Sequence, residues 1–368
     1  MLAPFVFLIR GAYKISPKFS LSSQNKPFDQ QLLSNRHLGG YFTGDRHQKI
    51  STRDTFYTLM GMRFLSQNVT EEYIELLAKH MNAKNQVPAY FTETMFGTIV
   101  PHYKENSYEI VDSSAIFIIL LEWLMQSRSQ TVKRLYLHAQ RAMQYLETFI
   151  KDDVFYEPKN GSWENTRQYT ESSGLTTSVL VCQAMRSLEL ISMNSGNKAR
   201  QQHYVKSHTR FIKHLKVKLF QSQETLPRML SIYWNMMPCS FWRSFDQELD
   251  LTIPLITDGP LTYPSTWESW LYGIDDEHST LVYPWIGYFW IAILGRKLKI
   301  EKAKEYFCEY SEFHSKITLF SAYDQLSLTP VRRAFLSATS AHSITLSMYM
   351  AARDLCEKQE LDKKVDNV

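Results

Sequence analysis

A carboxylate directly after an indole ring is the feature of this chain that could most directly do chemistry. Glu164 follows Trp163 at the tip of a predicted loop, just before a long apolar helical segment. A carboxyl group beside an indole is partly removed from water, which disfavours its charged form and suits it to general acid catalysis near neutral pH. A solvated surface glutamate is the alternative interpretation of the pair when it is taken alone.

A second charged pair, Arg53 and Asp54, stands at the start of a predicted helix. An aspartate in the first turn interacts favourably with the helix dipole, which would explain the pair without any function. An arginine and a carboxylate can also hold sugar hydroxyls through charge-assisted hydrogen bonds. The two interpretations stay open at this point.

Helical periodicity dominates the chain from Arg53 onward, with Thr52 as the expected N-cap of the first helix. Residues 116–121 are apolar on every side, which predicts a helix buried all round. The later helical patterns alternate between mostly apolar and amphipathic or charged, at residues 132–150, 172–192, 203–220, 283–294, 301–313 and 336–353. An inner apolar helix followed by an outer charged one predicts an all-α fold of two concentric rings. An α-solenoid is the alternative, but no fixed-period repeat supports it.

Length and composition favour one large helical domain. The chain has 368 residues with 44% hydrophobic and 21% charged residues, and only 13 Gly and 13 Pro, so turns are few. No linker divides residues 1–368, and we expect residues 1–40 to form an N-terminal extension and residues 355–368 a flexible tail. The net charge is +4 without a block of like charges, which argues against a nucleic-acid partner.

Cofactor and membrane signals are missing from the sequence. The 4 Cys are widely spaced without a C-x-x-C, so neither a zinc knuckle nor a redox motif is indicated, and no nucleotide-binding or zinc-protease motif occurs. We expect no cofactor and no metal. The apolar start, residues 1–10, is too short to span a bilayer. We interpret it as a packed segment, with a targeting sequence as the alternative, and expect a cytoplasmic protein with no membrane span.

Several motifs resemble the six-hairpin glycosidases, with glucoamylases and glucodextranases closest. Residues 51–59 resemble their Arg-Asp helix start, and residues 161–170 resemble their general-acid loop. Residues 111–114 are similar to a helix start shared with amylo-1,6-glucosidases and neutral invertases. Residues 283–303 resemble the fifth helical hairpin, and residues 336–341 resemble the closing helix.

The motifs follow the family's order from about residue 40 to residue 352, and this resemblance implies an (α/α)6 barrel with a pocket at one end. It assigns Arg53 and Asp54 to the terminal sugar and Glu164 to the general acid. The first hypothesis is therefore an exo-acting, metal-free, inverting glycoside hydrolase whose substrates are oligosaccharides or polysaccharides with α-linked glucose. The candidates for stacking on sugar rings, each of which could equally be a core residue, are Trp163, Trp267 and Trp285.

The chain departs from the family at the second catalytic carboxylate. Ser321 occupies the position of the general base, and Asp324, three residues on, is the substitute candidate. Inverting hydrolysis needs a base on the far face of the sugar, with the two carboxyl groups roughly 6.5–9.5 Å apart, and serine is too weak a base. The second hypothesis is therefore a carbohydrate-binding or regulatory protein without hydrolysis. The third is a lyase or epimerase that uses His278 or His342 as its base.

Overall fold

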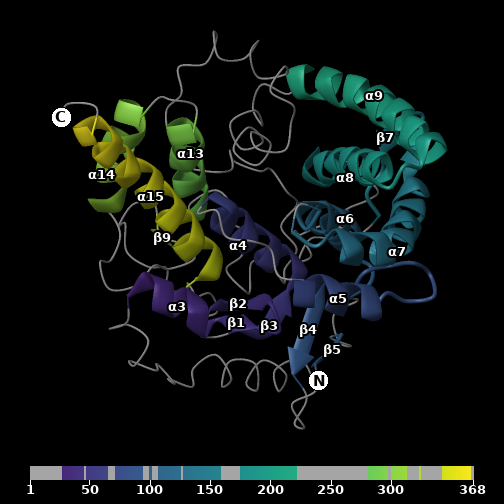
Figure 1. Ribbon diagram of the computed structural model, residues 1–368, viewed down its shortest axis with the longest axis horizontal. Helices are drawn as coiled ribbons and strands as arrows, with labels where there is room; N and C mark the ends of the chain where they lie inside the picture. Colours follow the sequence, from purple (N-terminus) through teal and green to yellow (C-terminus); the bar gives the residue numbers. More distant parts are fainter. Residues whose placement is uncertain are drawn as a thin grey trace, which may run out of the picture.

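The fold consists mainly of helical hairpins, with a small sheet at one edge of the molecule (Figure 1). This computed structural model describes residues 27–44, 47–64, 71–93, 99–101, 107–125, 127–158, 175–221, 281–282, 284–296, 300–312, 323–324 and 342–365.

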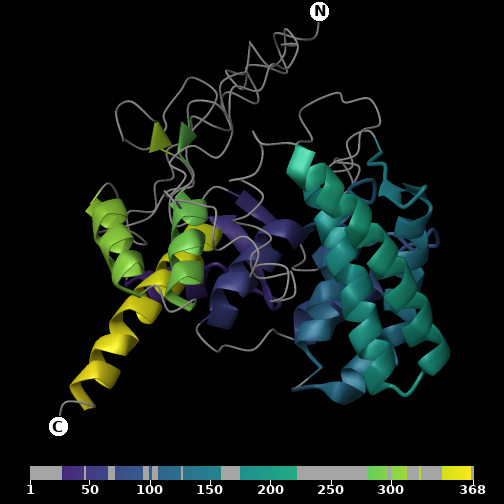
Figure 2. The same cartoon turned by 90° about the horizontal axis from the view of Figure 1, so that it is seen from above.

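The inner helices contact one another in a curved row. Their order in space is α13, α15, α4, α6 and α8. Helix α15, the last inner helix along the chain, therefore packs against α4, the first one. Figure 2 shows the same order from above, with α4 between the two groups of helices. The bounds of these inner helices are α4 (Thr52–Phe64), α6 (Asp112–Trp123), α8 (Leu175–Asn194), α13 (Pro284–Arg296) and α15 (Ser343–Val365).

Outer helices cover this row, and several form hairpins with the inner helix that precedes them. The pairs α6 with α7, α8 with α9, and α13 with α14 are in contact, and α3 packs on α15. The bounds of the outer helices are α3 (Phe28–Ser34), α5 (Glu71–Lys79), α7 (Ser129–Glu147), α9 (Lys198–Gln221) and α14 (Ile300–Glu312). The predicted alternation of inner and outer helices is confirmed for the described residues.

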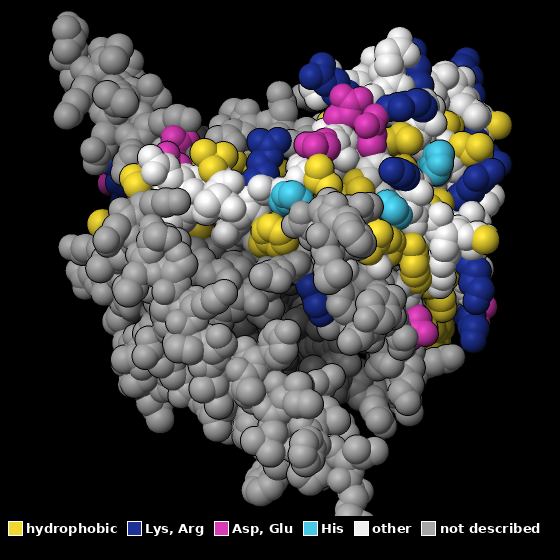
Figure 3. All heavy atoms as spheres, turned by 90° about the horizontal axis from the view of Figure 1, so that it is seen from below, with side chains coloured by type: hydrophobic (Ala, Val, Ile, Leu, Met, Phe, Trp, Pro, Cys, Tyr) yellow, Lys and Arg dark blue, Asp and Glu magenta, His cyan; other side chains and the backbone are white. Residues whose placement is uncertain are grey.

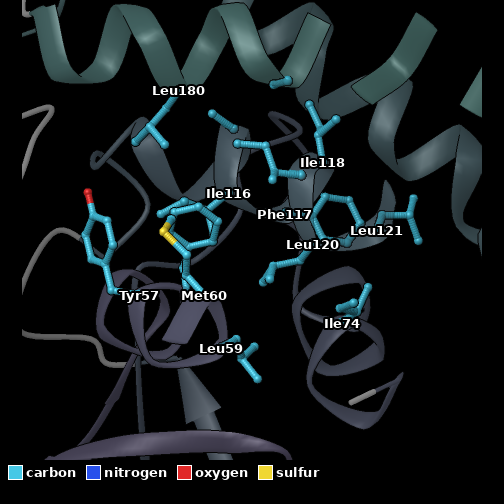
Figure 4. Close-up of a cluster of buried hydrophobic side chains, with 14 of the residues drawn as sticks. Tyr57, Leu59, Met60, Ile74, Ile116, Phe117, Ile118, Leu120, Leu121 and Leu180 are labelled. Atoms are coloured by element: carbon cyan, nitrogen blue, oxygen red, sulfur yellow. The ribbon is translucent and has the colours of Figure 1, made fainter. Parts of the chain in front are cut away.

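Helix α6 lies at the centre of the hydrophobic core. Its residues from Asp112 to Leu121 are all buried, as the apolar run predicted. Figure 4 shows side chains of α4, α5 and α8 around it, among them Met60, Ile74 and Leu180. Each fully buried aliphatic or aromatic side chain contributes roughly 1.5–3 kcal/mol, so this helix anchors its neighbours.

Helix α7 is amphipathic, again as predicted. Its buried residues Leu135, Ala139, Ala142 and Leu146 follow the helical spacing, while Leu137 on another face is 53% exposed. This pattern places α7 in the outer layer, with one side on the core and one side in solvent.

The N-cap of α4 differs from the prediction by one residue. The Ser51 hydroxyl accepts the N–H of Asp54 at 3.2 Å, which is the bond that an N-cap makes to the third helical residue. Thr52, predicted as the cap, instead donates its hydroxyl to the Pro88 carbonyl at 2.8 Å and accepts the Tyr73 hydroxyl at 3.1 Å. Thr52 therefore links the start of α4 to Pro88 and Tyr73, and Ser51 caps the helix.

A five-stranded antiparallel sheet lies beside the N-terminal end of α4 and was not predicted. Strand β3 leads directly into α4 and pairs with β4 in the register Ser51 to Tyr90. The bounds of these strands are β1 (Arg36–His37), β2 (Gly40–Gly44), β3 (His47–Ser51), β4 (Tyr90–Glu93) and β5 (Ile99–Pro101). Two smaller sheets pair β6 (Ile150–Lys151) with β7 (Val154–Phe155), and β8 (Leu281–Val282) with β9 (Tyr323–Asp324).

Helix α15 is joined to the N-terminal part of the chain at its first turn. The Asn35 side-chain amide donates to the Ser343 hydroxyl at 2.9 Å, and that hydroxyl donates to the Phe42 carbonyl at 2.5 Å. His342 caps the helix, because its Nδ1 accepts the Thr345 N–H at 3.4 Å. The helix was predicted from residue 336; residues 325–341 lie outside the described part.

No helix in the described ranges is long and apolar enough to cross a bilayer. The predicted domain boundaries, the extension over residues 1–40 and the tail over residues 355–368 remain predictions. Within those stretches, α3 and β1 form before residue 40, and α15 continues to Val365.

Candidate functional site

The first turns of neighbouring inner helices α4 and α6 meet in a buried ion pair. Arg53 is the second residue of α4 and Asp112 is the first residue of α6. Asp112 Oδ2 accepts Nε of Arg53 at 2.8 Å and Nη2 at 2.5 Å. The side chain of Arg53 is 16% exposed and that of Asp112 is 3% exposed. The carboxylate therefore lies deeper than the guanidinium that it holds.

The surroundings keep the Arg53 guanidinium charged. Burial lowers the pKa of Arg53, but the Asp112 carboxylate, helped by Tyr90 and Tyr57, opposes this, and the net pKa is raised above its ordinary value. A charge that is buried and paired in this way is fixed in position. Arg53 is thus a permanent, oriented donor.

One edge of Arg53 makes no hydrogen bond with the described residues. Guanidinium has five N–H donors, and the two hydrogen bonds to Asp112 use the edge formed by Nε and Nη2. These are the hydrogen bonds that Arg53 makes within the part of the chain that the structure describes. The remaining N–H groups can therefore donate to the oxygen atoms of a ligand.

Aromatic rings lie next to this ion pair. Tyr57, one turn after Arg53 in α4, packs against Trp285, the second residue of α13, with ring centroids 5.2 Å apart. Tyr57 is 6% exposed and Trp285 is half-buried. Tyr90 of β4 is half-buried, and the ammonium group of Lys49 lies 5.9 Å from the centre of its ring. Aromatic rings beside hydrogen-bond donors are what a sugar, with its apolar faces and polar rim, requires.

Two of the predicted site residues, Arg53 and Trp285, are therefore brought to one end of the inner helices. They are 232 positions apart in the sequence, yet Tyr57, one turn after Arg53 on α4, packs against Trp285. Asp54 follows Arg53 on α4, and its backbone N–H donates to the Ser51 hydroxyl at 3.2 Å.

The other predicted site residues are only partly described. Glu164, Trp163 and Trp267 lie outside the described residues, as do Ser321 and His278. The backbone of Asp324 lies in β9 opposite Leu281, three residues before α13 begins at Pro284. This backbone position is near the same helix start that carries Trp285.

His342, the other candidate of the lyase hypothesis, has a structural position. It is 6% exposed, and its Nδ1 is 2.7 Å from the Thr345 hydroxyl as well as capping α15. These hydrogen bonds of His342 therefore stabilise the first turn of α15.

Sequence reasoning missed the placement of two buried carboxylates. Asp112 was interpreted only as part of a helix start, but the structure records no side-chain capping bond at α6. Glu157 is 8% exposed, and its Oε2 accepts the hydroxyl of Thr177, in the first turn of α8, at 3.2 Å. The signal that could have found Asp112 is positional, because an acidic residue stands in the first turn of both α4 and α6.

Among the described residues, neither a cluster of metal ligands nor, on the face in Figure 3, a surface patch of one charge sign stands out. Nowhere in the described ranges do three or more His, Cys, Asp or Glu side chains gather as they would around a metal ion. Acidic and basic side chains are interspersed on the described part of the face in Figure 3. Elsewhere in the described residues, Arg128 forms an ion pair with Glu71 at 3.3 Å.

Comparison with known proteins gives matches at the level of structure. No family model and no curated protein matches this chain. A rhamnosidase from Klebsiella oxytoca with rhamnose bound has a TM-score of 0.59 and 11% identity, covering 94% of this chain and 65% of that chain. A glycosidase variant in complex with glucose has a TM-score of 0.60 and 11% identity, covering 92% and 98%. A GH63 mannosylglycerate hydrolase from Thermus thermophilus in complex with glucose has a TM-score of 0.57 and 8% identity, covering 88% and 98%.

These likenesses extend over most of the chain and confirm the predicted (α/α)6-barrel fold. The chain spans about two thirds of the rhamnosidase and nearly all of the other two. Because the sequence identities are only 8–11%, these matches show the fold and not the activity. The closer resemblance to glucoamylases stays a prediction from the sequence motifs.

Proposed function

We propose that this protein is a glycoside hydrolase that removes a terminal sugar from an oligosaccharide or polysaccharide. One observation carries the proposal: Arg53, held by Asp112, offers an open N–H edge next to the Tyr57 and Trp285 rings. The setting supports it, because the solved structures with this fold include glycosidases with rhamnose or glucose bound.

The proposed chemistry is inverting hydrolysis of an α-glucoside. Arg53 and Asp54 bind the hydroxyls of the terminal sugar, and aromatic side chains, Trp285 among them, pack on its faces. Glu164 donates a proton to the oxygen of the leaving group, and a base on the opposite face deprotonates the attacking water.

Asp324 is the proposed base. Its backbone pairs with the strand that leads into α13, the helix that carries Trp285. A residue at this point of the chain is at the correct end of the helices for a role in the same site. Ser321 at the family's base position is the reason for assigning the role to Asp324.

The decisive variant is Glu164→Gln. An amide keeps the shape of the carboxyl group but cannot donate its proton, so we expect kcat on an α-glucoside to fall about 10²–10⁴-fold while sugar binding is retained. Reducing-sugar release and calorimetric binding measure the two properties separately. Glu72→Gln, an exposed position at the start of outer helix α5, is the matched control and should behave as wild type. Full activity of Glu164→Gln would reject the mechanism.

A non-hydrolytic carbohydrate-binding or regulatory protein is the second candidate, favoured by Ser321 where the family has its base. In that case the wild type binds α-glucosides without releasing sugar, and Asp324→Asn has no effect on turnover because there is none. In the hydrolase, Asp324→Asn lowers kcat, whereas Ser321→Ala leaves it nearly unchanged.

A further inference from the structure

Asp112 is held in place from two sides. Its Oδ2 accepts both hydrogen bonds from Arg53, and its Oδ1 accepts a longer hydrogen bond from the Ser113 hydroxyl at 3.5 Å. With 3% exposure it lies behind Arg53, which is 16% exposed. A ligand that reaches Arg53 therefore meets the guanidinium before it meets the carboxylate.

We infer that Asp112 is a specificity-determining residue, which cancels the charge of Arg53 so that the site accepts uncharged sugar ends and rejects acidic ones. The inference rests on the proposed sugar site and adds a property that neither the fold nor the sequence motifs assign. Asp112 acts through Arg53 and does not itself contact the sugar.

An arginine without a counter-charge recognises anionic groups. A guanidinium in a partly buried position binds carboxylates and phosphates through two parallel hydrogen bonds, and such charged bonds are roughly twice as strong as neutral ones. Asp112 already occupies one edge of Arg53 and supplies the opposite charge. A second carboxylate at the open edge would therefore face Asp112 repulsion, whereas a hydroxyl oxygen would not.

Asp112 also fixes the direction of the open edge. A guanidinium held at both Nε and Nη2 cannot rotate about its last side-chain bonds, so its remaining donors point in one direction. A neutral hydroxyl, which forms a weaker hydrogen bond than a carboxylate, depends on this preorganisation.

Among the described residues, Lys49 and Asp54 also carry charge beside the Arg53–Asp112 cluster. Lys49 lies over the Tyr90 ring, and Asp54 follows Arg53 on α4, so these two carry opposite signs. Together with the Arg53–Asp112 pair, the four side chains sum to zero.

The test compares glucose with glucuronate, which differ in charge and little in shape. For the wild type we expect calorimetry to show glucose bound more tightly than glucuronate, and 4-nitrophenyl α-glucoside hydrolysed with a higher kcat/KM than the α-glucuronide. Asp112→Asn keeps the shape and one acceptor oxygen but uncovers the Arg53 charge. We expect it to shift both ratios towards the acidic sugar by about tenfold or more, in a salt-sensitive manner.

Ser113→Ala is the matched control, because it removes a contact of Asp112 and leaves the charge in place. It should leave the glucose-to-glucuronate ratio at the wild-type value. If Asp112→Asn does not fold, the wild-type ratio decides, since a wild type that binds glucuronate as tightly as glucose contradicts the inference.

The outcomes separate this inference from the proposed hydrolase. A binding ratio that shifts in Asp112→Asn without any hydrolysis overturns the hydrolase and supports the role of Asp112. Hydrolysis with an unchanged ratio overturns the role of Asp112 and supports the hydrolase. Failure of both sugars to bind overturns the role of Asp112.

Discussion

Each end of the α4–α6 helix pair carries an arginine on α4 and an acidic residue on α6. The two charges are hydrogen-bonded at the N-terminal end, whereas at the C-terminal end the arginine lies over an aromatic ring. At the N-terminal end, Arg53 of α4 and Asp112 of α6 are joined by hydrogen bonds of 2.8 and 2.5 Å. At the C-terminal end, the Arg63 guanidinium of α4 lies over the Trp123 ring of α6, 4.4 Å from its centre, and Glu122 precedes Trp123 in the chain.

The electrostatics of the two ends differ accordingly. The pKa of Arg53 is raised despite burial, because Asp112 compensates for it. The pKa of Arg63 is lowered by partial burial, which Glu122 offsets incompletely. Burial likewise raises the pKa of Glu122 against the influence of Arg63 and Arg186. Composition therefore does not define a site: the N-terminal charges stabilise each other, and the C-terminal charges are less well compensated.

The largest expected effect follows from breaking the N-terminal pair. Asp112→Asn leaves the buried Arg53 without its counter-charge, so we expect the free energy of unfolding to fall by about 3–5 kcal/mol. Urea denaturation followed by circular dichroism measures it. The double variant Arg53→Leu with Asp112→Leu removes both charges and should recover part of the loss. A change below about 1 kcal/mol for Asp112→Asn would make the two ends equivalent.

An intermediate effect is expected in the last turn of α4, where Gly61 faces α15. A Cβ added at Gly61 would lie 2.6 Å from the Ser347 hydroxyl oxygen and 2.8 Å from the Ser347 carbonyl carbon of α15. Gly61→Ala must therefore push the two helices apart, at a cost of about 1–3 kcal/mol in unfolding free energy.

Gly295→Ala in α13 is the control for this variant. There the added Cβ would meet Leu355 Cβ at 3.4 Å, which is ordinary contact, so the helix propensity of alanine should leave stability equal or slightly higher. Equal losses for both variants in thermal or urea unfolding would show that the close approach of α4 and α15 does not decide the outcome.

The smallest effect concerns Glu122 and depends on pH. Because the folded pKa of Glu122 is raised above its ordinary value of 4.5, the folded state binds more protons than the unfolded state between these two values. Stability therefore falls as the pH rises through this window. Glu122→Gln removes the loss, so its unfolding free energy should exceed that of wild type by up to about 0.5 kcal/mol at neutral pH and match it below the ordinary pKa.

A series of urea titrations across this pH range, with both proteins in the same buffers, measures the difference. A loss of stability in Glu122→Gln at neutral pH would mean that Glu122 is as well compensated as Asp112, and the contrast between the two ends would disappear.

The helical layers could be predicted from sequence because their signal is local. The apolar run of α6 and the one-sided pattern of α7 each record burial within a single element. The start of α4 was also predicted, although Ser51 rather than Thr52 caps it. Chain order and motif resemblance together were sufficient for the (α/α)6 barrel.

The partner of Arg53 could not be predicted in the same way. Arg53 and Asp112 are 59 positions apart, and an aspartate at a helix start has an ordinary explanation as a cap. The packing of α4 on α6 brings their two first turns together, and the sequence periodicity of either helix does not predict this packing. The strands were missed for a related reason, since elements of two to five residues have no measurable period.

The contact of α15 with the N-terminal part has a consequence for biosynthesis. Asn35 and Ser343 are 308 positions apart, and Phe42 and Ser343 are 301 positions apart. The chain must therefore be synthesised as far as Ser343 before α3 and β2 can make these contacts with α15. Loop closure over such separations slows folding. The α15-facing surface of the N-terminal segment consequently stays uncovered until Ser343 has been synthesised, and surface exposed in this way during folding favours aggregation.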